Sequence, residues 1–127
     1  MAIVLVVDDE PDIRNLVRHL LSVAGHEVRL ASDGAEALVS VGKERPDVML
    51  LDVSMPVMDG FEVLERLRAN PETAEIPVVL VTTLPPSKGE YAGREMGVTH
   101  YLTKPWDSGT LETAVRVVLR ETQPANQ

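Results

Sequence analysis

The sequence predicts a single α/β domain built around a parallel sheet. Three short apolar runs are rich in Val, Ile and Leu, at Ile3 to Val7, Val48 to Leu51 and Val78 to Val81. Such runs are typical of strands that are buried on both faces, as in parallel sheets. Segments with helical spacing separate them, and strands that alternate with helices indicate an α/β fold. The length of 127 residues fits one domain.

The first helix is expected directly after the first strand. Pro11 suits the first turn of a helix, and Gly25 suits the position after its C-terminal end. A weaker strand candidate, Val28 to Ala31, follows this helix. The apolar residues of the helix recur at helical spacing and are Ile13, Leu16, Val17, Leu20 and Leu21.

Acidic pairs three positions apart predict the starts of the next two helices. Asp33 stands three residues before Glu36 and opens the second helix. Asp59 has the same relation to Glu62 and opens the third, which should end before Pro71. The apolar positions of these two helices are Leu38, Val41, Phe61, Leu64 and Leu67.

A fourth helix and a fifth strand are expected in the next segment. Ser87 and Glu90 repeat the capping pattern and open the fourth helix. Gly89 and Gly93 lie inside it, and each costs about 1 kcal/mol relative to alanine. This helix is therefore predicted to be short and labile. The weaker strand candidate that follows is Val98 to Leu102.

The last helix is expected to close the domain. Asp107 is its N-cap, and the segment from Thr122 to Gln127 is polar and expected to be disordered. We therefore expect the domain over residues 1–121 and a tail over residues 122–127. The apolar positions of the last helix are Leu111, Ala114, Val115, Val118 and Leu119.

The composition predicts the cellular compartment of the protein and excludes some classes of partner. Twenty acidic and twelve basic residues give a net charge of −8. A surface this acidic repels phosphate backbones and anionic lipid, so no direct nucleic-acid or membrane partner is expected. The chain has no cysteine, which excludes disulfides and thiol chemistry. No apolar run approaches the roughly 18 residues of a membrane span, and a cytoplasmic protein is expected.

Polar residues follow the predicted strands at the points where the strands end. The carboxyl ends of parallel strands share one edge of a sheet, and ligands bind there. Taken singly, each residue has an ordinary structural explanation, such as Asp9 at the positive end of the first helix. Together they predict a cluster of carboxylates with one ammonium. Its members are Asp8, Asp9, Asp52, Thr82, Thr103 and Lys104.

The charges of this cluster predict its chemistry. Two carboxylates about 4 Å apart repel by roughly 4 kcal/mol at an effective dielectric of 20. Three therefore need compensation, which Lys104 and a hard divalent cation such as Mg²⁺ can provide. A pocket whose negative charges are balanced in this way can receive a phosphoryl group. Asp52 stands alone on its strand and is the expected nucleophile, which would form an aspartyl phosphate.

Four stretches of the sequence contain the residues of this cluster. They are Val-Val-Asp-Asp-Glu at 6–10, Leu-Leu-Asp-Val-Ser-Met-Pro-Val-Met-Asp-Gly at 50–60, Val-Thr-Thr at 81–83 and Tyr-Leu-Thr-Lys-Pro-Trp at 101–106. In this order they resemble the receiver domain of two-component response regulators of the chemotaxis-regulator type. The resemblance extends from about Ile3 to Leu119 and implies a flavodoxin-like sheet with strand order 2-1-3-4-5, flanked by five helices.

The resemblance also implies a metal site at the phosphoacceptor. Asp52 corresponds to the phosphoacceptor and to a Mg²⁺ ligand. Asp9 corresponds to a direct ligand and Asp8 to a ligand through water. The backbone carbonyl of Ser54 corresponds to a further ligand.

A switch is implied by three other positions. Lys104 resembles the lysine that contacts the phosphoryl group. Thr82 resembles the hydroxyl that closes on this group, and Tyr101 resembles the aromatic residue that turns inward with it. The surface of the fourth helix, the fifth strand and the last helix is expected to respond. Trp106 stands two residues after Lys104 and should report on the site.

The implied function is a signalling switch rather than an enzyme. A histidine kinase or histidine phosphotransfer protein would supply the phosphoryl group, and the phosphorylated form would bind a downstream protein or an output domain that is missing from this chain. A phosphorylation-dependent dimer through the last helix is left open. Thr83 stands where the family frequently has alanine, and Ser54 and Leu84 occupy positions that tune hydrolysis in the family. The rate at which the phosphoryl group is gained and lost is therefore left open.

Three alternatives are weighed against this interpretation. A Mg²⁺-dependent aspartyl-phosphate phosphohydrolase usually carries a second acid two residues after its nucleophile, where this chain has Ser54. A scaffold that works without phosphorylation does not need the complete set of site residues. A flavodoxin-like nucleotide binder would need a glycine-rich loop after the first strand, where Asp9-Glu10-Pro11 stands.

Overall fold

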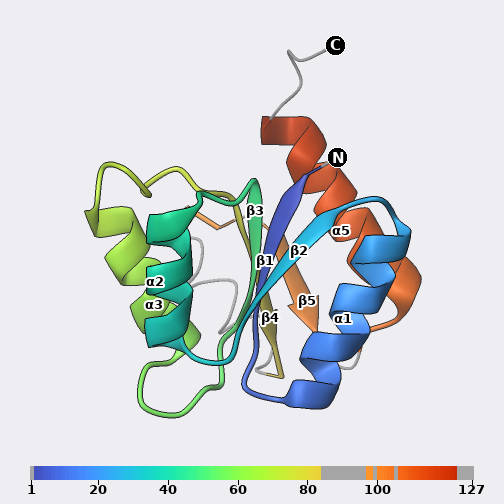
Figure 1. Cartoon of the computed structure of the whole chain (residues 1–127), viewed down its shortest axis with the longest axis horizontal. Coiled ribbons are helices and arrows are strands. Elements are labelled where there is room, and N and C mark those ends of the chain that lie inside the picture. Colours follow the sequence, from blue (N-terminus) through green and yellow to red (C-terminus); the bar gives the residue numbers. More distant parts are fainter. Residues whose placement is uncertain (1, 84–96, 99, 105, 123–127) are drawn as a thin grey trace.

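The computed structural model describes residues 2–83, 97–98, 100–104 and 106–122, and it confirms the predicted sheet. Five parallel strands form one sheet in the order β2-β1-β3-β4-β5 (Figure 1). The expected order 2-1-3-4-5 is therefore observed. The strands are β1 (Ile3–Val7), β2 (Glu27–Ala31), β3 (Val48–Asp52), β4 (Val78–Thr82) and β5 (His100–Thr103).

Helices cover both faces of the sheet. Figure 1 shows α2 and α3 on one side of the strands and α1 and α5 on the other. The fourth helix that the sequence predicts, with Gly89 and Gly93, lies outside the described residues, as do residues 123–127 of the expected tail. Thr122, which was expected to begin the tail, is instead the last residue of α5, where its hydroxyl donates to the carbonyl of Val118 at 2.9 Å. The helices are α1 (Pro11–Val23), α2 (Gly34–Lys43), α3 (Gly60–Ala69) and α5 (Ser108–Thr122).

Alternate residues of the central strands pack into two separate hydrophobic layers. Successive side chains of a strand point to opposite faces, so Leu5 and Val7 enter the layer under α2 and α3. Val4 and Val6 enter the layer under α1 and α5. Every residue of β3 is buried, which agrees with the continuous apolar run in the sequence.

The predicted helix boundaries follow from local chemistry. Pro11 is the first residue of α1, and Gly25 has φ +95°, a conformation that glycine adopts without strain. Asp33 and Asp59 accept hydrogen bonds from backbone N–H groups three residues later, at 2.7 Å and 2.9 Å. Asp107 caps α5 in the same way, through the N–H of Thr110 at 2.7 Å.

Two apolar residues lie elsewhere than their sequence patterns indicate. Leu16 is 47% exposed, because only the face of α1 with Val17 and Leu21 lies against the sheet. Val98 is buried but precedes β5, which begins at His100. It fills the core from the turn before the strand, where Gly97 has φ +81°. An apolar residue in a core-facing loop therefore has the same sequence signature as a strand residue.

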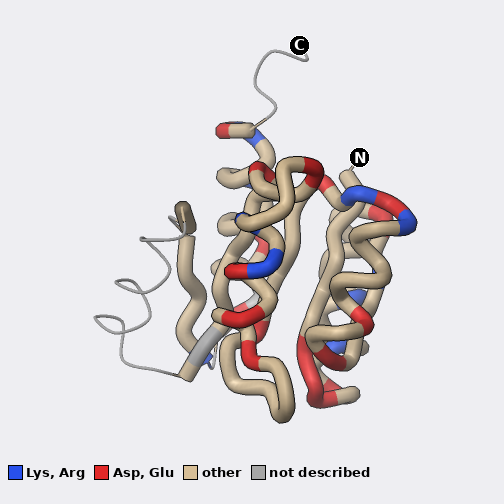
Figure 2. The backbone as a smooth tube through the Cα atoms, turned by 90° about the vertical axis from the view of Figure 1, so that its left-hand side faces the viewer, with Lys and Arg blue, Asp and Glu red and all other residues tan. Residues whose placement is uncertain are grey.

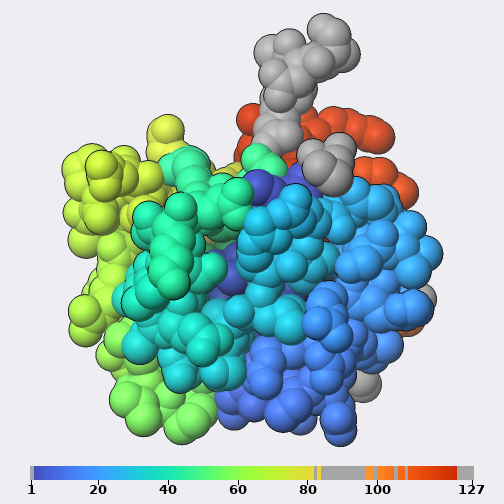
Figure 3. Space-filling model, viewed as in Figure 1, coloured from blue at the N-terminus to red at the C-terminus, as the bar shows by residue number. Residues whose placement is uncertain are grey.

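The carboxyl ends of the strands meet at one edge of the molecule. Figure 2 shows acidic residues at the lower end, where β1 ends and α1 begins. In Figure 3 the side chains of β2 and of the flanking helices cover the sheet from the side of its outer strand. Four of the five residues of β1 and all residues of β3 are buried, and the last residues of both strands reach the lower edge. Among the described residues, no helix is long and apolar enough to cross a bilayer.

Candidate functional site

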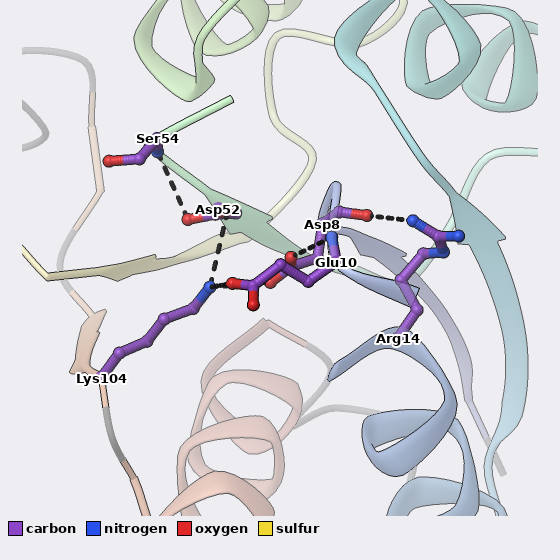
Figure 4. A network of polar contacts seen from close by, with 6 residues as sticks. All are labelled: Asp8, Glu10, Arg14, Asp52, Ser54 and Lys104. Carbon is purple, nitrogen blue, oxygen red and sulfur yellow. Dashed lines mark hydrogen bonds and ion pairs between the residues drawn. The ribbon is translucent and has the colours of Figure 1, made fainter. Parts of the chain in front are cut away.

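Lys104 lies within contact distance of two other predicted site residues, Asp8 and Asp52, at this edge. Asp8 follows β1, Asp52 is the last residue of β3, and Lys104 follows β5. The Nζ of Lys104 lies 3.0 Å from Oδ2 of Asp8 and 3.6 Å from Oδ2 of Asp52 (Figure 4). Lys104 reaches both carboxylates although β4 separates β5 from β3.

Burial and charge make Asp52 an unusual carboxyl group. Asp52 and Asp8 are each 3% exposed, in contrast to the other acidic residues near them. Burial, followed by repulsion from Asp8, raises the pKa of Asp52 to about 6, against the opposing effect of Lys104. The mutual repulsion that the sequence predicts for this cluster is therefore present in the metal-free protein.

Asp8 is held by the start of α1. Its Oδ1 accepts a hydrogen bond from the backbone N–H of Glu10 at 2.9 Å. Its backbone carbonyl accepts one from the guanidinium of Arg14 at 2.7 Å. The second carboxylate oxygen is left for Lys104. Both the backbone and the side chain of Asp8 are thus fixed before any ligand binds.

Lys104 is the shared counterion of the site. Its side chain is 14% exposed, and Glu10 Oε1 lies 3.5 Å from its Nζ in addition to the two aspartates. Burial alone lowers the pKa of Lys104, but the hydrogen bond to Asp8 and the charges of Asp52, Asp8 and Glu10 raise it overall. Lys104 therefore stays an ammonium ion at neutral pH and can offer its N–H groups to an anion.

The acidic residues next to β1 have the chemistry of a magnesium site. One ligand oxygen from each of Asp8, Asp9 and Glu10 lies within 4.8 Å of the others. Asp9 and Glu10 are exposed, so a hydrated cation has access to this side. Carboxylate oxygens with room for water ligands are what Mg²⁺ prefers. The residues present therefore fit a divalent cation.

The loop after β3 is packed tightly around Asp52. The N–H of Ser54 donates to Oδ1 of Asp52 at 3.3 Å. Gly60 lies so close that an added Cβ would be 2.4 Å from the carbonyl oxygen of Asp52 and 2.8 Å from Cα of Val53. Any other residue at position 60 would displace this loop. A glycine is thus required beside the expected phosphoacceptor.

The residues expected to form a switch lie on β4 and β5. Thr82 ends β4, one position beyond Val81, which pairs with Asp52. Tyr101 is half-buried, and its hydroxyl donates to the carbonyl of Val98 at 2.9 Å. Trp106 lines a small cavity together with Asp8 and Asp52, so a response of its fluorescence to the site is structurally reasonable.

Sequence reasoning did not assign a role to Glu10, Arg14 or Gly60. Glu10 directly follows Asp8 and Asp9, and its place in this acidic run could have indicated that it belongs to the site. Asp59 was interpreted as a helix start, and Gly60 entered only as part of the stretch at 50–60 that resembles the receiver family. Nothing in the sequence indicates that Arg14 reaches back to the carbonyl of Asp8, because this contact depends on how α1 packs.

The doubly wound sheet, with paired aspartates after β1, an aspartate at the end of β3 and a lysine after β5, defines the receiver class of signalling domains. Residues 4–116 match the model of the response regulator receiver domain family. The chain belongs to this family.

Solved and curated relatives agree with this assignment. The chemotaxis response regulator CheY4 of Vibrio cholerae is 42% identical with a TM-score of 0.87, over 93% of this chain and 98% of that chain. Two regulators are each 39% identical, RpaA of Synechocystis sp., a DNA-binding dual master transcriptional regulator, and the response regulator MprA of Mycobacterium leprae. The matches cover 94% and 95% of this chain but only 49% and 52% of the relatives, so the chain spans about half their length.

Proposed function

We propose that this chain is a phosphorylation-switched receiver whose acceptor is Asp52. The observation that supports this most is the contact of the Lys104 ammonium with both buried aspartates, at 3.0 Å to Asp8 and 3.6 Å to Asp52. A nucleophilic carboxylate beside a fixed cation suits attack on a phosphoryl group. The chain acts as a switch that catalyses only its own phosphorylation and dephosphorylation.

In the proposed transfer, a carboxylate oxygen of Asp52 attacks the phosphorus of an N-phosphohistidine or of a small acyl phosphate. A P–O bond to Asp52 forms while the P–N bond, or the donor's own P–O bond, breaks. The imidazole leaves and takes a proton from solvent, or the donor leaves as a free carboxylate. Lys104 donates N–H groups to a phosphoryl oxygen as negative charge shifts onto the group.

Magnesium is the proposed cofactor of this transfer. Asp8, Asp9 and Asp52 would hold it with the backbone carbonyl of Ser54, Asp8 acting through water. When bound, the cation supplies positive charge that balances the transferring phosphoryl group. This assignment rests on the carboxylate chemistry of the cluster and on the receiver family.

The proposed switch involves Thr82 and Tyr101. The Thr82 hydroxyl would donate to a phosphoryl oxygen, and Tyr101 would turn inward with it. A charge-assisted hydrogen bond of about 1.5–3 kcal/mol shifts a two-state equilibrium about tenfold to a hundredfold. The responding surface is proposed to include β5 and α5, together with the segment between β4 and β5.

The proposed partners are proteins in the cytoplasm. A histidine kinase or histidine phosphotransfer protein would donate the phosphoryl group, and a downstream protein or an output domain would receive the signal. Because the net charge is −8, direct binding of nucleic acid by this chain is not part of the proposal. Regulation of transcription is the role of RpaA, a protein about twice as long.

The test is intact mass spectrometry after incubation with Mg²⁺ and acetyl phosphate. We expect a gain of one phosphoryl group, which disappears when Mg²⁺ is chelated and in Asp52→Asn. Asp33→Asn is the matched control, because Asp33 also follows a strand end and asparagine caps a helix as well as aspartate does. Phosphorylation of Asp52→Asn at the wild-type level, or no phosphorylation of the wild type, would contradict the proposal.

A further inference from the structure

Glu10 lies in an unexpected place for the residue that begins a helix. It is the N-cap of α1, but its side chain makes no capping hydrogen bond. Its Oε1 lies instead 3.5 Å from Nζ of Lys104, on the open side of the site (Figure 4). The side chain of Glu10 is therefore directed at the lysine that the proposed function assigns to the phosphoryl group.

The three carboxylates around Lys104 differ in how easily an incoming anion can displace them from the lysine. The side chains of Asp8 and Asp52 are 5% and 4% exposed, and the packing around them fixes their positions. The side chain of Glu10 is 62% exposed and has a longer, more flexible stem. An ion pair at such an exposed site is weak, so an incoming anion can displace it.

Charge counting shows why displacement matters. Asp8, Asp9, Glu10 and Asp52 surround one ammonium ion, so the metal-free site carries a net charge of −3. Glu10 adds a negative charge at the solvent side, from which a phosphodonor approaches. Its Oε1 also lies 3.5 Å from the Nζ of Lys104, on the ammonium that a phosphoryl oxygen needs.

We propose that Glu10 is a displaceable latch on Lys104 that slows phosphorylation of this receiver by holding the lysine and by repelling anionic donors. Glu10 is a positioning residue, which acts through Lys104 and takes no part in bond making. The inference rests on the proposed function of Asp52 and Lys104. It assigns to the residue after the aspartate pair a role in setting the rate of the switch.

The first experiment measures the rate of phosphorylation by acetyl phosphate in Glu10→Ala and Glu10→Gln. We expect both variants to react about two- to fivefold faster than the wild type at low ionic strength, since the contact is worth up to about 1 kcal/mol. The gain should shrink in high salt, because screening weakens interactions between exposed charges. Glu65→Ala is the control, an exposed glutamate on α3 whose replacement should leave the rate unchanged.

A second experiment requires neither Mg²⁺ nor phosphoryl transfer. Reductive methylation of the metal-free protein, mapped by mass spectrometry, reports how accessible each lysine is. We expect Lys104 to be methylated about two- to fivefold faster in Glu10→Ala than in the wild type, with exposed Lys43 as the internal reference. This measurement separates a failure of the latch from a failure of the proposed function.

The results have distinct meanings. Slower phosphorylation together with weaker Mg²⁺ binding in both variants would make Glu10 a metal ligand and overturn the latch. Wild-type rates of phosphorylation and methylation would also overturn it while leaving the proposed function intact. If methylation of Lys104 increases but phosphorylation does not accelerate, the contact exists without setting the rate, and the proposal is wrong. If the wild type accepts no phosphoryl group, the proposed function fails and the rate-setting role fails with it.

Discussion

The Nζ of Lys104 lies 3.0 Å from the carboxylate of Asp8, a residue 96 positions earlier in the chain. The contact joins the ends of β5 and β1, which are separated by two strands in the sheet. It places the positive charge of the site on the same carboxylate that Mg²⁺ is expected to use. The ammonium and the proposed metal would therefore compete for the carboxylate of Asp8.

Replacing Lys104 by methionine should change metal binding and phosphorylation in opposite directions. Loss of the ammonium leaves the carboxylates without their counterion, so Mg²⁺ should bind about tenfold more tightly at low ionic strength. Phosphorylation by acetyl phosphate should nevertheless fall at least about a hundredfold, because no N–H group stabilises the transferring charge. Trp106 fluorescence follows the metal titration, and intact mass follows phosphorylation. Weaker metal binding in Lys104→Met would show that the lysine organises the carboxylates rather than competing for them.

The raised pKa of Asp52 predicts a pH-dependent stability difference. The folded-state pKa of about 6 lies above the ordinary value of 3.8, so ionisation of Asp52 destabilises the metal-free fold as pH rises through this window. Asp52→Asn removes this effect. The variant should gain about 2–3 kcal/mol of unfolding free energy relative to the wild type between about pH 4 and pH 7. Urea unfolding at both pH values provides the measurement. A difference that is independent of pH would rule out the raised pKa.

Gly60 and Gly42 should respond to alanine in opposite directions. At Gly60 the added Cβ would lie 2.4 Å from the carbonyl oxygen of Asp52, so Gly60→Ala should cost about 2–4 kcal/mol and lower the phosphorylation rate. Gly42 lies in α2 with open space at its Cβ position, and Gly42→Ala should stabilise by about 1 kcal/mol. Urea unfolding tests both, and equal effects of the two substitutions would contradict the packing around Asp52.

Val57 carries backbone strain in the loop beside the site. It has φ 69° and is fully exposed, and valine rarely adopts this conformation. Val57→Asn should stabilise the protein by about 0.5–1 kcal/mol, because asparagine tolerates positive φ. Val39→Asn is the matched control, since Val39 is exposed within α2 and valine and asparagine have similar helix propensities, so this variant should leave the stability nearly unchanged. Thermal melts distinguish the two variants, and a loss of stability in Val57→Asn would contradict this account.

Much of the architecture could be predicted because its signals are local. Continuous apolar runs marked the buried strands, and Asp33 and Asp59 marked helix starts through hydrogen bonds three residues away. The site was predictable because parallel strands end at one edge, which brings Asp8 and Asp52 together.

The remaining features depend on packing between distant segments. Leu16 fits the apolar period of α1 but lies on its exposed side, and Val98 is apolar but belongs to a turn. The contact of Glu10 with Lys104 depends on the direction of one flexible side chain. Spacing along the chain contains none of this information.

The most direct test of the central claim is to identify the phosphorylated residue. Borohydride reduces an acyl phosphate to homoserine, which marks the acceptor in a peptide map. After incubation with Mg²⁺ and acetyl phosphate, we expect homoserine at position 52 alone, and none when Mg²⁺ is chelated. Homoserine at another aspartate, or an unmodified peptide containing Asp52, would contradict the proposal that this receiver is phosphorylated on Asp52.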